Sequence, residues 1–140
     1  MIVLDTNVLS EMMKASPSAD VARWLAAQPA TSLYTTAVTQ AEILHGVMLL
    51  PAGRRRGAIE KAAEAMFDED FAGRVLPFGS DAARLYARIA ADRRRAGRPI
   101  SHFDAQIAAI ARSAGAAVAT RDVADYHGCG VEVIDPWEAH

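Results

Sequence analysis

The chain has 140 residues, 51% of them hydrophobic, and a formal net charge of −2 at pH 7. These values fit one folded domain with its own core, and they exclude both a disordered chain and a surface that is basic throughout. No apolar run approaches the roughly 18 residues of a membrane helix, no secretory signal is apparent at the N-terminus, and a lone Cys129 excludes an intrachain disulfide. We therefore expect a single cytoplasmic domain over residues 1–140, with no membrane partner.

Strand and helix patterns alternate along the whole chain. In the first half we expect a strand at 1–4, a helix at 8–13, a helix opened by Pro17 and Ser18 and stopped by Pro29, a strand at 33–36, and a helix capped by Thr39 that ends before Pro51. In the second half we expect a helix at 58–71, a strand at 75–77, a helix capped by Ser80, a helix at 103–114 capped by Ser101, and strands at 116–120 and 131–134.

The predicted strands are apolar on both faces, as the strands of parallel sheets are, and helices separate most of them. The expected fold class is therefore α/β, a three-layer α/β/α sandwich around a mostly parallel sheet. Ligands of open parallel sheets bind beyond the carboxyl ends of the strands. Asp5 follows the first predicted strand and Asp122 follows the fourth, so both should emerge at that edge.

Four acidic residues lie at the start of a predicted helix or just after a predicted strand: Asp5, Glu42, Asp104 and Asp122. Each has a simple structural explanation when taken alone, because acids favour helix N-termini and turns. Glu42, for example, would complete a capping box that begins at Thr39, in the first turn of its helix. In a parallel sheet, however, the helices that follow the strands all begin along one edge, so the four carboxylates should converge there.

Several carboxylates in one cleft repel one another strongly unless a cation shares the cleft. Hard oxygen ligands are what Mg²⁺ accepts, and Mn²⁺ takes a similar set. Such an ion would hold a phosphodiester oxygen, activate a water molecule and stabilise the charge of an in-line displacement. The four acids together therefore predict a metal-dependent site for phosphodiester chemistry.

Several segments, taken together, resemble the VapC/FitB branch of the PIN-domain family. They are MIVLDTN at 1–7, the helix with Ala41, Glu42 and Gly46, PISHFDAQIA at 99–108, ATRD at 119–122 with Asp125 and Tyr126, and DPW at 135–137. They span nearly the whole chain, in the family's order and with its approximate spacing. The resemblance implies a bacterial toxin of a type II toxin–antitoxin pair, a Mg²⁺-dependent endoribonuclease held inactive by a cognate antitoxin. It also suggests a homodimer.

The resemblance further implies a role for each acid. Asp5 and Asp104 are expected to be the principal metal ligands, and Glu42 a ligand or a general base. Asp122 is expected to be the fourth acid, with Asp125 as a competitor for its role. The residues expected to orient these carboxylates by hydrogen bonds are Thr6, Asn7 and Thr120. The expected reaction is attack of activated water on an RNA phosphodiester, which leaves a 5′-phosphate and a 3′-hydroxyl.

Two arginine clusters could contact the RNA substrate on this acidic background. They contain Arg54 and Arg55 in one place and Arg93 and Arg94 in another. The alternative is that both clusters are solvated helix faces, and nothing in their spacing puts them on one surface.

Three alternatives compete with a nuclease. A phosphotransferase of the haloacid-dehalogenase type needs a second Asp where this chain has Asn7, and a receiver-like domain needs an Asp after the third strand, where this chain has Pro77. The serious alternative is a non-catalytic PIN-like module that binds RNA or a protein partner, with the acids acting only as helix caps. Binding of Mn²⁺ that is lost on Asp5→Asn would distinguish a catalytic cluster from a set of caps.

Overall fold

The computed structural model describes residues 1–139 of the chain, so His140 of the expected domain lies outside the described part. The strands are β1 (Ile2–Leu4), β2 (Leu33–Thr36), β3 (Val75–Leu76), β4 (Ala117–Ala119) and β5 (Val133–Ile134). The α-helices are α1 (Thr6–Met12), α2 (Ala19–Ala26), α3 (Ala37–Met48), α4 (Arg54–Ala65), α5 (Ser80–Arg95) and α6 (His102–Ser113). A π-helical turn at Met66–Asp70 extends α4, and 3-10 turns span Ala30–Ser32 and Val123–Tyr126.

The five strands form one parallel sheet in the order β3-β2-β1-β4-β5. The chain moves outward from β1 through β2 to β3 and then returns to the other side of β1 to add β4 and β5. The order therefore reverses between β1 and β4, where Leu4 pairs with Ala119. In an open parallel sheet such a reversal opens a crevice at the carboxyl ends of the two strands.

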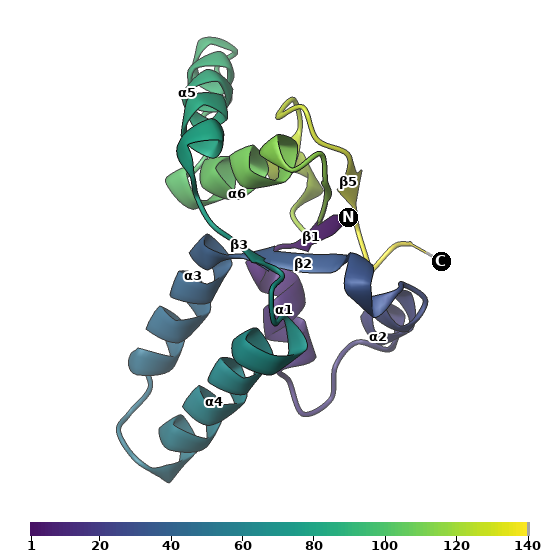
Figure 1. The fold of residues 1–140 in the computed structure, drawn as a ribbon, viewed down its shortest axis with the longest axis vertical. Coiled ribbons are helices and arrows are strands. Elements are labelled where there is room, and N and C mark those ends of the chain that lie inside the picture. The colour runs from purple at the N-terminus through teal and green to yellow at the C-terminus, as the bar shows by residue number, and fades with distance from the viewer. Residues whose placement is uncertain (140) are drawn as a thin grey trace.

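Helices cover both faces of the sheet, which confirms the predicted three-layer α/β/α sandwich (Figure 1). Alternate residues of β1 point to opposite faces, as strand geometry requires. Val3 packs in the core with α5 and α6, whereas Leu4 packs in the core with α1, α2 and α4. Within residues 1–139, no helix is long and apolar enough to cross a membrane.

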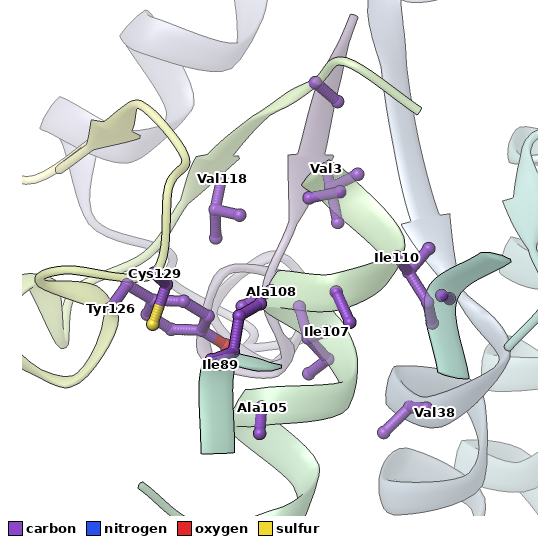
Figure 2. Packing of buried hydrophobic residues seen from close by; sticks show 14 residues of the cluster. Val3, Val38, Ile89, Ala105, Ile107, Ala108, Ile110, Val118, Tyr126 and Cys129 are labelled. Carbon is purple, nitrogen blue, oxygen red and sulfur yellow. The ribbon is translucent and has the colours of Figure 1, made fainter. Parts of the chain in front are cut away.

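Most of the buried residues of α6 are alanines, and Ile107 and Ile110 are the two larger ones. Ala105, Ala108, Ala109 and Ala111 are all buried, with Ile107 between them. Figure 2 shows several of these side chains against Val3 and Val118 of the sheet. Side chains this small let the helix axis lie close to the strands. The position of α6, and of the acid it carries, is therefore set by close packing.

The prediction for the start of α3 was wrong. Thr36, the last residue of β2, is the cap, and its hydroxyl accepts a hydrogen bond from the Thr39 N–H at 3.0 Å. The strand passes directly into the helix because Thr36 is still extended, with φ −126° and ψ 156°. Glu42 consequently lies in the second turn of α3 and closes no capping box with Thr39.

Boundaries of other helices also differ from the prediction, since α1 begins at Thr6 instead of residue 8, with Asp5 as its cap. The α4 helix begins at Arg54 instead of residue 58, and its regular part ends at Ala65. Ser80 is the first residue of α5, and Gly79 is its cap without a side-chain hydrogen bond. By contrast, Ser101 caps α6 as predicted, since its hydroxyl accepts from the Asp104 N–H.

Candidate active site

A pocket of about 420 Å³ lies at the carboxyl ends of the central strands, and all four predicted acids line it. Asp5 follows β1, Glu42 lies on α3, Asp104 lies in the first turn of α6, and Asp122 follows β4. The pocket coincides with the reversal of strand order between β1 and β4. The predicted convergence of the four carboxylates is therefore confirmed.

Asp5 is the most firmly held of these acids. Its Oδ1 accepts from the Thr6 N–H at 2.8 Å, which caps α1, and its Oδ2 accepts from the Thr120 hydroxyl at 2.8 Å. Its own N–H donates to the Ala119 carbonyl, which extends the ladder between β1 and β4. The residue is only 5% exposed. Burial raises the pKa of Asp5 to about 6, although both hydrogen bonds to its carboxylate oppose the shift.

The hydroxyl of Thr120 links Asp5 to the loop that carries Asp122. Besides donating to Asp5, it accepts from Asn7 Nδ2 and from the Asp122 N–H, both at 3.1 Å. Asn7 Nδ2 also lies 3.2 Å from Asp122 Oδ2. One buried hydroxyl thus fixes the relative positions of two of the acids. Thr120 and Asn7 lie where the resemblance placed them, beside the carboxylates.

Glu42 faces the pocket from α3 and makes one side-chain hydrogen bond to α1. The Thr6 hydroxyl donates to Glu42 Oε1 at 2.8 Å and lies 3.1 Å from the buried Thr39 hydroxyl. Burial is the main reason that the pKa of Glu42 is raised, and the negative charge of Asp104 adds to the effect. Glu42 is therefore easier to protonate than a solvated glutamate.

Asp104 approaches the other acids from α6. The Tyr126 hydroxyl donates to Asp104 Oδ1 at 3.4 Å, which is a long hydrogen bond. The pKa of Asp104 is raised first by burial and then by the negative charges of Asp125 and Asp122. Repulsion between these acids favours a state in which a proton or a cation is present.

Tyr126 is a site residue that the sequence analysis quoted in a motif but gave no role. It is 1% exposed, and its hydroxyl lies beside Asp104 and Asp5. Burial and these two neighbouring charges raise the pKa of the phenol far above its usual range, so it acts only as a donor. The only sequence signal was a large aromatic residue in a polar loop after the fourth strand.

Asp122 and Asp125 occupy different places. Asp122 lines the pocket with Asp5 and Glu42, whereas Asp125 lines a smaller pocket of about 150 Å³ on the other side of Asp104. Asp125 therefore influences Asp104 electrostatically without joining the acids of the larger pocket. Of these two residues, Asp122 is the one that lines the pocket with Asp5, Glu42 and Asp104.

The structure corrects the expected role of Arg93. This residue is 8% exposed, and its guanidinium donates to the carbonyl oxygens of Arg98, Asp125 and His127. Because its guanidinium is buried and bonded to three backbone carbonyls, Arg93 stabilises the loop after β4 and is not exposed for contact with RNA. Arg54 and Arg55 are exposed on α4 and Arg94 on α5, but these two helices lie at opposite ends of the molecule (Figure 1).

The donor chemistry of the pocket fits a hard divalent cation. Carboxylate and hydroxyl oxygens line it, and burial makes uncompensated negative charge costly there. Within residues 1–139, no three acids, histidines or cysteines lie closely enough together to enclose an ion. Mg²⁺ does not require such a cage, because it usually keeps several waters and takes only one or two protein carboxylates.

Comparison with known proteins identifies the family. The PIN domain model matches residues 2–124, and the chain belongs to the PIN-domain family, as the resemblance in the sequence indicated. It is 44% identical over 138 residues to the VapC ribonuclease Y4jK of Sinorhizobium fredii, with 99% of each chain covered.

Several solved structures are similar to the whole fold, including the following two. The crystal structure of FitAcB from Neisseria gonorrhoeae matches with a TM-score of 0.93 and 37% identity, over 99% of this chain and 100% of that one. VapBC-5 of Mycobacterium tuberculosis, a member of the VapBC family of toxin–antitoxin systems, matches with a TM-score of 0.69 and 32% identity, over 94% and 95% of the two chains.

Proposed function

We propose that the chain is a Mg²⁺-dependent endoribonuclease and the toxin of a type II toxin–antitoxin module, acting in the cytoplasm. The observation that carries this proposal is the single pocket into which four separate elements deliver a carboxylate. Desolvation raises the pKa of Asp5, Glu42 and Asp104, which is typical of an acid cluster adapted to a cation. The similarity to a VapC ribonuclease and to a VapBC system supports the same activity.

Asp5 and Asp104 would hold the metal ion, and Glu42 and Asp122 would complete its surroundings directly or through water. Mn²⁺ should substitute, because it accepts the same oxygen ligands. When bound, Mg²⁺ supplies positive charge for the phosphodiester and lowers the pKa of a coordinated water. The paired hydrogen bonds from Thr6 and Thr120 keep the Asp5 carboxylate in one orientation for this purpose.

Glu42 is suited to accept the proton of the attacking water. Its raised pKa makes it a better base than a solvated glutamate, and the Thr6 hydroxyl fixes its Oε1. The water oxygen forms a bond to phosphorus while the bond from phosphorus to the 3′ oxygen breaks. The 3′ oxygen then takes a proton from solvent, so the products are a 5′-phosphate and a 3′-hydroxyl.

We further propose a cognate antitoxin and a homodimer as the partners of this chain. The antitoxin is suggested by the toxin–antitoxin system among the similar structures. The dimer is suggested by large apolar side chains exposed on the first helices, which include Met12 and Met48. Light scattering of the purified chain should give twice the 15.0 kDa of one copy, and a monomer would contradict the dimer.

The decisive experiment is cleavage of a mixed RNA pool, with every new end mapped. Wild-type protein should cut with Mg²⁺ or Mn²⁺ and should be inactive in EDTA. Asp104→Asn, which keeps the shape of the side chain but removes its charge, should lower the rate by about a thousandfold, or about 4 kcal/mol. Asp68→Asn, an exposed acid after α4, is the matched control and should cut normally.

Three results would contradict the proposal. They are cleavage that persists in excess EDTA, ends that carry 2′,3′-cyclic phosphate, and full activity of Asp104→Asn. Folded protein that binds RNA and Mn²⁺ but cuts no RNA would favour the non-catalytic binding module.

A further inference from the structure

The acidic pocket has a second wall that carries positive charge. Besides the four acids, the residues that line it include Lys14 and Arg121, together with Glu11 and Trp137. None of these four residues belongs to the arginine clusters that the sequence suggested as RNA contacts. Lys14 and Arg121 are therefore additional candidates for anion binding, and they lie beside acids that repel anions.

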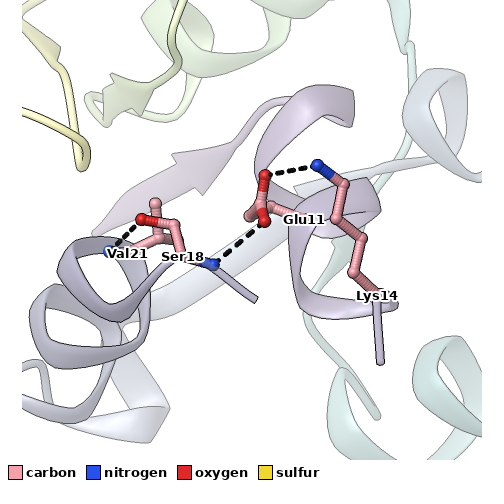
Figure 3. A network of polar contacts seen from close by, with 4 residues as sticks. All are labelled: Glu11, Lys14, Ser18 and Val21. Carbon is pink, nitrogen blue, oxygen red and sulfur yellow. Dashed lines mark hydrogen bonds and ion pairs between the residues drawn. The ribbon is translucent and has the colours of Figure 1, made fainter. Parts of the chain in front are cut away.

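Lys14 is held in place by a fixed carboxylate. Its Nζ lies 2.9 Å from Glu11 Oε1, and the other oxygen of Glu11 accepts from the Ser18 N–H at 3.0 Å (Figure 3). Glu11 is itself 6% exposed, whereas the side chain of Lys14 is 61% exposed. A buried acid thus orients a cation whose remaining N–H groups still face solvent at the pocket.

Arg121 is restrained from two sides. Its N–H donates to Asn7 Oδ1 at 3.2 Å, which ties its backbone to α1. Its guanidinium lies over the ring of Trp137, 5.1 Å from the centroid, and the Trp137 N–H is fixed in turn by Asp135. Stacking on an aromatic face leaves the edge N–H groups of a guanidinium free to bind oxygen anions.

The charges of the pocket suggest that Lys14 and Arg121 bind phosphate. Four carboxylates carry more negative charge than one divalent ion neutralises, so a phosphodiester that enters the pocket meets net repulsion. Glu11 offsets only one of the two cations, and the group of Lys14, Arg121 and Glu11 keeps a net charge of +1. An RNA chain carries a phosphate at every nucleotide, so neighbouring phosphates can reach this wall while one of them lies at the acids.

We propose that Lys14 and Arg121 form a phosphate-binding subsite for single-stranded RNA, which holds the phosphates next to the one that is cut. This inference rests on the proposed function and specifies how its substrate is bound. Lys14 and Arg121 are binding residues with no part in proton transfer. Trp137 acts as a positioning residue, because it fixes the guanidinium of Arg121.

The test combines kinetics with salt dependence. Lys14→Gln, Arg121→Gln and Arg121→Lys would be compared with wild type for cleavage of a single-stranded RNA of about 20 nucleotides. Each Gln variant should raise KM about tenfold and change kcat less than about twofold, because the contact is present before and during cleavage. Arg121→Lys keeps the charge but loses the stacked guanidinium, so it should restore only part of the loss in KM.

RNA binding would be measured in the Asp104→Asn background, in which the same RNA remains intact, over a range of salt concentrations. Each Gln variant should lower the slope of log Kd against log salt by about 0.7, the value for one phosphate contact to a single strand. Arg23→Gln is the matched control. It removes one charge from another i,i+3 ion pair, on α2 and outside the pocket, and should change neither KM nor the slope.

The outcomes separate the two proposals. If wild type cuts RNA while both Gln variants keep its KM and salt slope, the subsite is wrong and the nuclease proposal stands. A loss confined to kcat would also overturn the subsite. If wild type neither cuts nor binds RNA, the proposed function fails and the subsite fails with it. Thermal unfolding of each variant would verify that it is folded.

Discussion

The strand-borne and helix-borne halves of the acidic pocket are held in different ways. Asp5 follows a central strand, and both of its carboxylate oxygens have a hydrogen-bond donor at 2.8 Å. Glu42 projects from α3, where the Thr6 hydroxyl donates to it, and Asp104 projects from α6, where the hydroxyls of Ser101 and Tyr126 both bond to its side chain. One half is fixed by strand pairing and a bonded network, and the other by the packing of two helices.

The difference suggests a division of labour. A carboxylate with both oxygens occupied by donors cannot turn without losing hydrogen bonds, so in the proposed metal site Asp5 would be a ligand of fixed orientation. Glu42 has one hydroxyl donor and the bond from Tyr126 to Asp104 is long, so these two carboxylates are freer to turn than Asp5. Substitutions of Asp5 and Thr120 disrupt the fixed half, and a substitution of Tyr126 disrupts a contact with Asp104 of the other half.

The largest effect is expected for Asp5→Asn. Loss of this charge should lower RNA cleavage by at least about a thousandfold, because the fixed metal ligand is gone. Without metal, however, the variant should be more stable than wild type at pH 7.5. The pKa of Asp5 is raised from 3.8 to about 6, so ionising this buried acid opposes folding.

The pH dependence follows from the same shift. A group whose pKa is higher in the folded state contributes stability below its unfolded pKa and loses it as pH rises through the folded value. In EDTA, the unfolding free energy of wild type relative to Asp5→Asn should therefore fall by about 3 kcal/mol between pH 3.5 and pH 7.5. Urea unfolding at the two pH values would measure it, and a constant difference would contradict the burial of an ionisable Asp5.

A smaller effect is expected for Thr120→Val, which keeps the shape of the side chain but removes the shared hydroxyl. Asp5 loses a donor, and Asn7 and the Asp122 N–H lose an acceptor. We expect Mn²⁺ affinity and cleavage to fall about 10- to 100-fold, as for other groups that orient metal ligands. Thr120→Ser should retain near-wild-type affinity, and equal defects in both variants would show that the methyl group matters instead. Titration calorimetry with Mn²⁺ measures the affinity.

The smallest effect is expected for Tyr126→Phe, which removes a hydroxyl that lies beside both Asp104 and Asp5. Its hydrogen bond to Asp104 is long, so we expect cleavage to fall only about two- to tenfold, with Mn²⁺ affinity changed less. The pH profile of kcat should also move to higher pH, because a donor that favours ionised Asp104 is lost. A loss as large as that of Thr120→Val would mean that the Tyr126 hydroxyl orients the acids as strongly as the Thr120 hydroxyl does. The pH profile distinguishes positioning from a packing defect.

The convergence of the acids could be predicted because it depends on topology. Asp5 and Asp122 follow apolar strands, and parallel strands present their carboxyl ends at one edge. Asp104 was placed correctly because Ser101 gives a clear cap. Glu42 was placed on the right helix but in the wrong turn, because Thr36 and Thr39 are both plausible caps and only the extended backbone at Thr36 decides between them.

The surroundings of the acids could not be predicted, because they depend on contacts between segments far apart in the sequence. Arg93 belongs to a run of arginines that suggests solvent, yet it is buried by the loop after β4. The role of Tyr126 requires α6 and that loop to meet. Lys14 and Arg121 come to the same pocket only after folding. No local pattern marks any of these placements.

The buried alanines of α6 limit which substitutions are compatible with this fold. Replacing Ala105 or Ala108 with a larger apolar residue would insert volume into the closely packed core around α6, at a cost of about 1–3 kcal/mol. Such a change would move Asp104 away from its partners without altering any polar atom. In a genetic selection for loss of the proposed toxicity, inactivating mutations should therefore accumulate at these alanines as well as at the acids. The small side-chain volume at these positions of α6 would then be under as strong a selection as the negative charge of the acids in the pocket.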